Sequence, residues 1–157
     1  MSTGMCAGIG RGALAGAAGT TALNTVTYLD MVWRGRPSSS APERSAERLS
    51  EISGLPVPGD ERTRENRLTG LGALLGIAAG VGIGMAAGAL RSAGVRMPSW
   101  LEPIAIGALA MAAMDTSMAA VGVTDPRNWS GKDWASDVIP HLAYGVVTYR
   151  TLEATGV

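Results

Sequence analysis

Four polar side chains toward the C-terminal end of the sequence have the types and spacing of a proton or ion site. Asp115 lies within an apolar stretch, and Asp137, His141 and Tyr144 follow at intervals of four and three residues. Such intervals place side chains on one face of a helix, so a carboxylate, an imidazole and a phenol would lie in a row. Because histidine titrates near neutral pH, a carboxylate–imidazole pair is typical of a proton relay.

Two interpretations of these residues remain open from the sequence. An ionised carboxylate inside a membrane is expensive, so Asp115 is expected to be neutral, paired or facing water. It would then be either a proton or cation site, or a protonated side chain bonded to a neighbouring helix with help from Thr116 and Ser117. For His141 the alternative is packing after a kink at Pro140, with the imidazole bonded to a backbone carbonyl.

Other kinds of chemistry find no support in the sequence. One histidine and a lone cysteine, Cys6, do not form a zinc site, so neither a metal nor another cofactor is predicted. The two Gly-x-Gly patterns, at 8–10 and 82–84, lie inside apolar stretches rather than after strands, so they carry no nucleotide signal. The formal net charge is +0, which gives no sign of nucleic-acid binding. Nothing indicates an enzyme.

A glycine-rich stretch, Leu68 to Leu90, is the element around which we expect the chain to be organised. It runs for about 23 residues without a charge, enough for a helix to cross the roughly 30 Å core of a bilayer. Glycine recurs at every fourth residue, which stacks the glycines on one face and lets another helix approach closely in lipid. These glycines are Gly72, Gly76, Gly80, Gly84 and Gly88.

Three further apolar segments complete the predicted all-α membrane bundle. The first, Met5 to Trp33, repeats the glycine spacing at Gly8, Gly12 and Gly16, and the next spans Trp100 to Val123. The last, Trp134 to Ala154, has only about 12 largely apolar residues, so a re-entrant helix is the alternative to a fourth span. We predict one integral membrane domain over residues 1–157, with glycine-zipper packing between four helices.

A polar connection over residues 34–67 is predicted to carry a short amphipathic helix, either on the membrane surface or in solvent. Ser40 and Glu43 have capping-box spacing, and Gly54 and Pro56 would end the helix. Arginine is concentrated in this connection and, less densely, in the loop after residue 123. The positive-inside rule then places both connections in the cytoplasm and both termini outside.

An internal repeat is visible between residues 12–26 and residues 107–121. GALAGAAGTTALNTV lines up with GALAMAAMDTSMAAV, so Asp115 falls opposite Thr20. A duplicated helix hairpin would give two copies of parallel orientation, related by an axis along the membrane normal.

Several of these features together resemble the small bacterial inner-membrane proteins of the YagU type. They are the glycine-rich first helix, the segments Arg36-Pro37 and Ala41-Pro42-Glu43, and the final His141-Leu-Ala-Tyr144-Gly145. The resemblance implies a multi-helix protein of the inner membrane with a loose link to acid tolerance, and it supplies no catalytic residues.

The sequence therefore predicts a multi-pass protein of the bacterial plasma membrane that acts as a structural or accessory subunit. Its predicted partners are the lipid bilayer and either further copies of itself or a larger membrane complex, brought together through the glycine faces. The alternative is a small proton-coupled transporter or channel that uses Asp115 and His141.

Overall fold

The computed structural model describes residues 3–156, and within that range the chain forms helices and no strand. The all-α class is therefore confirmed. In chain order the elements are α1 (Thr3–Arg34), α2 (Ala41–Ser53), α3 (Glu61–Ser92), α4 (Glu102–Ala120), the short 3-10 helix η1 (Pro126–Asn128) and α5 (Gly131–Ala154).

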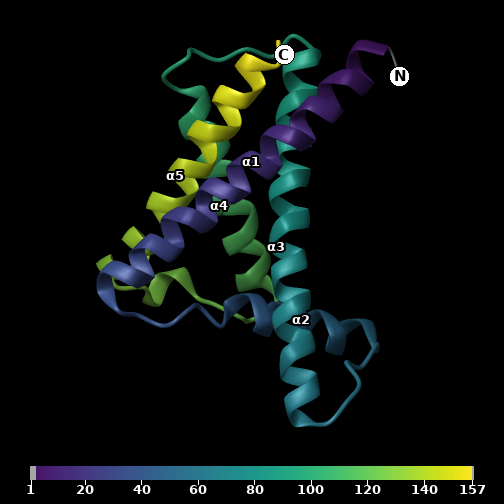
Figure 1. Ribbon diagram of the computed structural model, residues 1–157, viewed down its shortest axis with the longest axis vertical. Helices are drawn as coiled ribbons and strands as arrows, with labels where there is room; N and C mark the ends of the chain where they lie inside the picture. Colours follow the sequence, from purple (N-terminus) through teal and green to yellow (C-terminus); the bar gives the residue numbers. More distant parts are fainter. Residues whose placement is uncertain (1–2, 157) are drawn as a thin grey trace.

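The four long helices form a bundle in which α1 and α5 occupy the centre. Helix α1 crosses α3 near its own N-terminus and then runs beside α5, while α4 packs mainly on α5 and α2 lies against α3 (Figure 1). Both ends of the chain lie at one end of the bundle, and the connections α1–α2 and α4–α5 lie at the other (Figure 1). The glycine-rich helix α3 makes the most extensive helix–helix contact of the molecule, with α1, and it also packs against α2 and touches α4.

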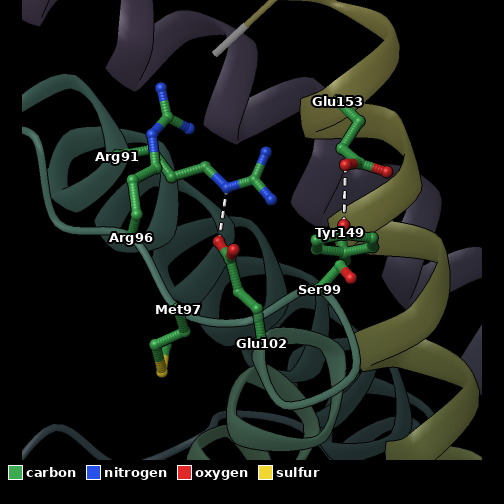
Figure 2. Close-up of a pocket in the computed structure, with 7 residues that line it drawn as sticks. All are labelled: Arg91, Arg96, Met97, Ser99, Glu102, Tyr149 and Glu153. Atoms are coloured by element: carbon green, nitrogen blue, oxygen red, sulfur yellow. Dashed lines mark hydrogen bonds and ion pairs between the residues drawn. The ribbon is translucent and has the colours of Figure 1, made fainter.

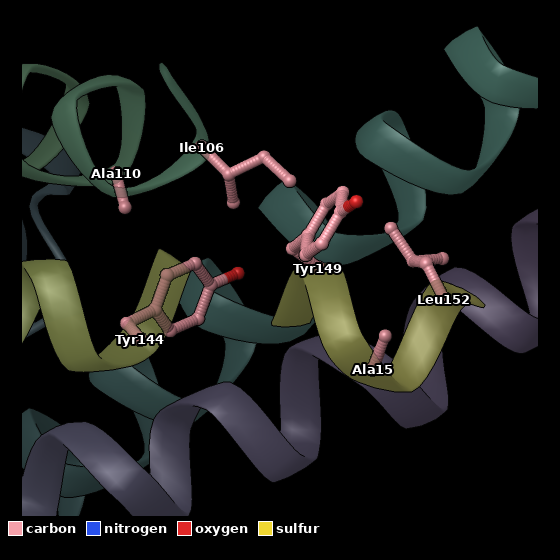
Figure 3. Close-up of a cluster of buried hydrophobic side chains, with 6 residues drawn as sticks. All are labelled: Ala15, Ile106, Ala110, Tyr144, Tyr149 and Leu152. Carbon is pink, nitrogen blue, oxygen red and sulfur yellow. The ribbon is translucent and has the colours of Figure 1, made fainter. Parts of the chain in front are cut away.

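The largest fully buried side chains all come from α5. Tyr144, Thr148 and Leu152 are at most 1% exposed, and Ala15 of α1 and Ile106 of α4 pack around them (Figure 3). A helix that is covered on several sides becomes the core of a bundle. The apolar residues of α5 are too few to show this in the sequence, because its core contacts include a threonine and tyrosines.

Two helices, α3 and α4, are long and apolar enough to cross a membrane. Only 11% of the apolar window in α3 and 22% of that in α4 is buried inside the protein. Leu74 and Leu109, for example, are 62% and 53% exposed. An amphipathic helix in water turns its apolar side inward, whereas these helices turn apolar side chains outward.

Helix α5 is longer than its short apolar segment predicts. It runs without a break for 24 residues, through Pro140, which corresponds to about 36 Å. It begins at a capping box in which Ser130 accepts from the backbone of Asp133 and the Asp133 side chain bonds back to Ser130. The helix is therefore longer than the roughly 30 Å of a bilayer core.

The caps of the polar connection differ in part from the prediction. Helix α2 begins after Ser40 and ends at a left-handed Gly54 as predicted, but the Ser40 side chain forms no cap hydrogen bond with the described residues. The capping-box prediction is therefore wrong. Asp60 caps α3 by accepting the Thr63 N–H at 2.8 Å, and its hydrogen bonds from the side chain and backbone of Thr63 lower the pKa of its carboxyl.

Candidate functional site

The glycines of α1 and α3 bring the two backbones into direct contact. Gly8 lies against Gly88, and Gly12 lies against Gly84. A Cβ added at Gly84 would overlap the carbonyl oxygen of Gly12 and the backbone nitrogen of Gly16. Side chains of any size would therefore push the helices apart, and van der Waals contact between backbones replaces side-chain packing here.

The remaining glycines of α3 do not all share this partner. Gly80 still faces α1, because a Cβ at Gly16 would come within 2.5 Å of the Gly80 carbonyl oxygen. The hydroxyl of Thr20 lies over Gly80, and Gly72 lies against Pro42 of α2. Gly76 has no atom of another described element within 4 Å of where its Cβ would stand, because α1 and α3 have diverged at this level (Figure 1). The prediction that Gly76 packs is therefore wrong for the helices of a single chain.

A second close approach, between α4 and α5, was missed by the sequence reasoning. A Cβ at Gly145 would come within 2.7 Å of the Gly107 nitrogen, and one at Gly107 would meet the carbonyl group of His141. Neither glycine belongs to a regular series, which is why the pattern does not reveal them. The internal repeat could have indicated this contact, because Gly107 stands opposite Gly12 in that alignment.

This approach brings Asp115 of α4 beside Asp137 and His141 of α5, and we name these three residues the acid–imidazole cluster. The Asp115 residue is 6% exposed, and its carboxyl group lies beside that of Asp137. The Nδ1 atom of His141 lies 2.8 Å from the backbone oxygen of Asp137 and 3.4 Å from its Oδ1. Three titratable groups from two helices therefore meet in one buried place.

The hydrogen-bonding geometry fixes where protons can sit in the acid–imidazole cluster. Two carboxyl groups can bond to each other only when one of them carries a proton. A carbonyl oxygen only accepts, so Nδ1 of His141 donates to the backbone oxygen of Asp137. Two buried oxygens, Asp115 Oδ1 and Asp137 Oδ2, have no hydrogen-bond partner among residues 3–156.

Other residues predicted near the cluster point elsewhere. The hydroxyl of Tyr144 donates to the backbone oxygen of Gly80 on α3 at 2.6 Å, so this tyrosine joins α5 to α3 and stands apart from the acidic pair. The hydroxyls of Thr116 and Ser117 each donate at 2.6 Å to a backbone oxygen of their own helix. They do not satisfy Asp115, contrary to prediction.

The cluster lies toward the end of the bundle that carries the α4–α5 connection, rather than at mid-depth as the sequence predicts for Asp115. Asp115 is in the last two turns of α4, and Asp137 is in the second turn of α5. At the same end Arg34 of α1 binds both Asp30 and the hydroxyl of Ser136, the residue before Asp137. The charged side chain of Arg34 thus contacts the residue that precedes Asp137 in the sequence.

Across the described part of the chain, no group of three His, Cys, Asp or Glu side chains is arranged to hold a metal ion. The imidazole also turns one nitrogen toward a backbone oxygen, so that nitrogen is engaged as a donor. Exchangeable protons and hydrogen-bonded water are the species that the free oxygens can take.

No family model, no curated protein and no solved structure matches the chain. The resemblance to YagU-type proteins therefore stays an expectation.

Proposed function

We propose that α1, α3, α4 and α5 all cross the bacterial plasma membrane as a four-helix bundle. Apolar side chains that face outward on α3 and α4 support this proposal, because lipid is the solvent that tolerates them. Helix α1 has 32 residues, about 48 Å, so it also exceeds the thickness of the hydrocarbon core. Four crossings return the chain to the side where it started, in keeping with termini at one end of the bundle (Figure 1).

Arginine and lysine give the proposed bundle its orientation. Of the 13 such residues, nine belong to the end with the α1–α2 and α4–α5 connections, and the other four belong to the end with the termini. The positive-inside rule places the richer end in the cytoplasm and both termini outside. Helix α2 then lies on the cytoplasmic side. The nine are Arg34, Arg36, Arg44, Arg48, Arg62, Arg64, Arg67, Arg127 and Lys132.

Within that bundle the geometry best supports a small proton-coupled transporter or channel. The observation that carries this function is the buried contact between Asp115 and Asp137 beside His141, with two carboxyl oxygens left without a partner. A purely structural hydrogen bond between helices would satisfy its own atoms, because an unsatisfied buried acceptor is destabilising. Ionisable groups inside a membrane otherwise mark proton and ion paths.

The proposed cycle moves one proton through the cluster. A proton from the cytoplasmic side is held between the two carboxyl groups of Asp115 and Asp137, passes to Nε2 of His141, and leaves that nitrogen toward the opposite side of the bundle. The charge of the imidazolium is then balanced by Asp137, whose Oδ1 is 3.4 Å from the ring. Each group returns to its starting protonation state, so the cycle needs no cofactor.

Replacing Asp115 by asparagine is expected to reduce proton flux to the leak of protein-free vesicles. The amide keeps the size of the side chain but cannot exchange a proton at this position. The measurement uses the full chain reconstituted in vesicles with a pH-sensitive dye and an imposed pH gradient. Glu65→Gln, which removes an exposed carboxyl in the polar start of α3, is the matched control and should retain the flux of the unchanged protein.

The proposal fails if Asp115→Asn inserts into vesicles and conducts protons like the unchanged protein. It fails equally if the unchanged protein gives no flux above that of empty vesicles.

The second candidate function is that of a self-associating or accessory subunit, and the open surface of α3 around Gly76 favours it. Gly76 continues the series in which Gly80, Gly84 and Gly88 contact the glycine-bearing helix α1. Leu71 and Leu74 beside it are 41% and 62% exposed. A second copy of the chain would bring a helix with small residues of the same kind.

Gly76→Leu is expected to dissociate the protein, because its side chain would stand where the second copy approaches. Native mass measurement in mild detergent should then show units of one 16.0 kDa chain in place of a multiple of that mass. Gly82→Leu, at a glycine that is also open but lies on another face, should assemble normally. A monomeric unchanged protein, or an assembled Gly76→Leu variant, would rule out this interface.

A further inference from the structure

A polar cleft of about 330 Å³ opens at the end of the bundle that carries the termini, where α3 ends, α4 begins and α5 ends. Arg91 and Arg96 stand on one side of it, and Tyr149 and Glu153 of α5 stand on the other (Figure 2). The volume is at the small end of the range for ligand sites, so a small polar group would fill it.

The base of the cleft is fixed by groups that already satisfy one another. Arg91 and Glu102 are each 5% exposed and form an ion pair. The guanidinium of Arg91 also lies over the ring of Tyr149, at 4.9 Å from the ring centroid. These contacts join α3, α4 and α5 and hold the walls of the cleft in place. Arg91 and Glu102 already bind each other, so they are not available to a ligand.

The two walls of the cleft carry groups that can still form hydrogen bonds, and these groups include an arginine on one side and a carboxylate on the other. On the α3–α4 side, neither Arg96 nor Ser99 forms a hydrogen bond or ion pair with any of the described residues, and both are exposed. On the α5 side, the carboxylate of Glu153 accepts from the hydroxyl of Tyr149 at 2.6 Å and from Arg150 at 3.3 Å. A carboxylate can accept about four hydrogen bonds, so Glu153 has capacity left.

The cleft also lies at the level where lipid headgroups are expected. Arg91 follows directly after the apolar stretch that ends at Leu90, and Trp100, next to Ser99, is 69% exposed. Exposed tryptophan is typical of the boundary between hydrocarbon and headgroups. An arginine at this level can bind a lipid phosphate through charge-assisted hydrogen bonds.

We infer that this cleft binds the headgroup of a zwitterionic phospholipid with a primary ammonium, of the phosphatidylethanolamine type. The phosphate receives hydrogen bonds from Arg96 and Ser99, and the ammonium donates to Glu153. A quaternary ammonium has no N–H to donate, and a glycerol headgroup has no positive charge, so both fit less well. The inference rests on the proposed membrane placement but is independent of proton transport.

Lipid retention measured by native mass spectrometry tests the inference. The full chain in mild detergent is mixed with equal amounts of phosphatidylethanolamine, phosphatidylcholine and phosphatidylglycerol. We expect phosphatidylethanolamine to be retained in preference to the other two, and Arg96→Gln to retain it about tenfold less, since a charge-assisted hydrogen bond is lost. Glu153→Gln should lose the preference among lipids. Arg62→Gln, an exposed arginine at the opposite end, is the matched control.

Other outcomes would overturn the inference in distinguishable ways. Equal retention of the three lipids, or an Arg96→Gln variant that behaves like the unchanged protein, removes the site while leaving the membrane placement intact. Displacement of the lipid by millimolar inorganic phosphate, with no effect of phosphoethanolamine beyond that of phosphate, identifies a free-anion site instead. A chain that stays dispersed without detergent and retains no lipid removes the membrane placement itself.

Discussion

Replacing Gly84 by leucine is expected to destabilise the protein by about 3 kcal/mol, because four new carbon atoms enter a contact between two backbones. A Cβ alone would already overlap Gly12 and Gly16, and backbone atoms cannot rotate away as a side chain can. Unfolding by titration with a denaturing detergent in mixed micelles measures the change.

Gly82→Leu provides the matched control for this prediction. It lies two residues away on the same helix, and the position of its Cβ is open to at least 4 Å within residues 3–156. Leucine has a better helix propensity than glycine by roughly 1 kcal/mol, so this variant should be at least as stable as the unchanged protein. Equal stability of the two leucine variants would contradict the close approach of α1 and α3.

Arg91→Met is expected to destabilise the bundle by about 3–5 kcal/mol, the usual effect of removing one member of a buried ion pair. The methionine fills part of the volume, but the carboxylate of Glu102 stays buried without its cation. The cation–π contact with Tyr149 is lost as well. The same unfolding titration measures the loss.

A double variant separates the charge effect from packing. Adding Glu102→Gln to Arg91→Met removes the buried charge, so the pair of changes should be less destabilising than Arg91→Met alone. Glu51→Gln breaks the exposed Arg48–Glu51 pair, whose side chains are 48% and 52% exposed, and should change stability little. A double variant less stable than Arg91→Met would show that packing, rather than charge, dominates at this position.

The sequence predicts the helices well where apolar runs are long and bounded by polar residues. The bounds of α1 and the end of α3 follow from such runs, and α2 is correctly ended by Gly54. Helix α3 begins at Glu61, seven residues before its apolar run. Helix α5 is harder because its buried face includes Tyr144 and Thr148, which periodicity does not count as core. Whether such a face is covered depends on three neighbouring helices, and that is tertiary information.

For the candidate site, the sequence gives the correct residue types but not all the contacts. Spacing places Asp137, His141 and Tyr144 on one side of α5, and two of them do meet Asp115. Tyr144 turns to α3 because α5 is enclosed by several helices, so a row that spans two turns meets different neighbours along its length. Gly76 lacks a contact for a related reason. The row of glycines on α3 is straight, and a helix that crosses this row at an angle contacts only part of it.

The repeated glycine crossing has a consequence for how the two halves of the chain divide their tasks. Gly12 meets Gly84 in the first hairpin, and Gly107 meets Gly145 in the second. Eight residues beyond Gly12 the first hairpin sets a hydroxyl against a bare backbone, whereas the second hairpin sets an acid against an imidazole at the corresponding depth. The two helix pairs thus share a close contact between glycines, but only the second pair places titratable side chains beyond it.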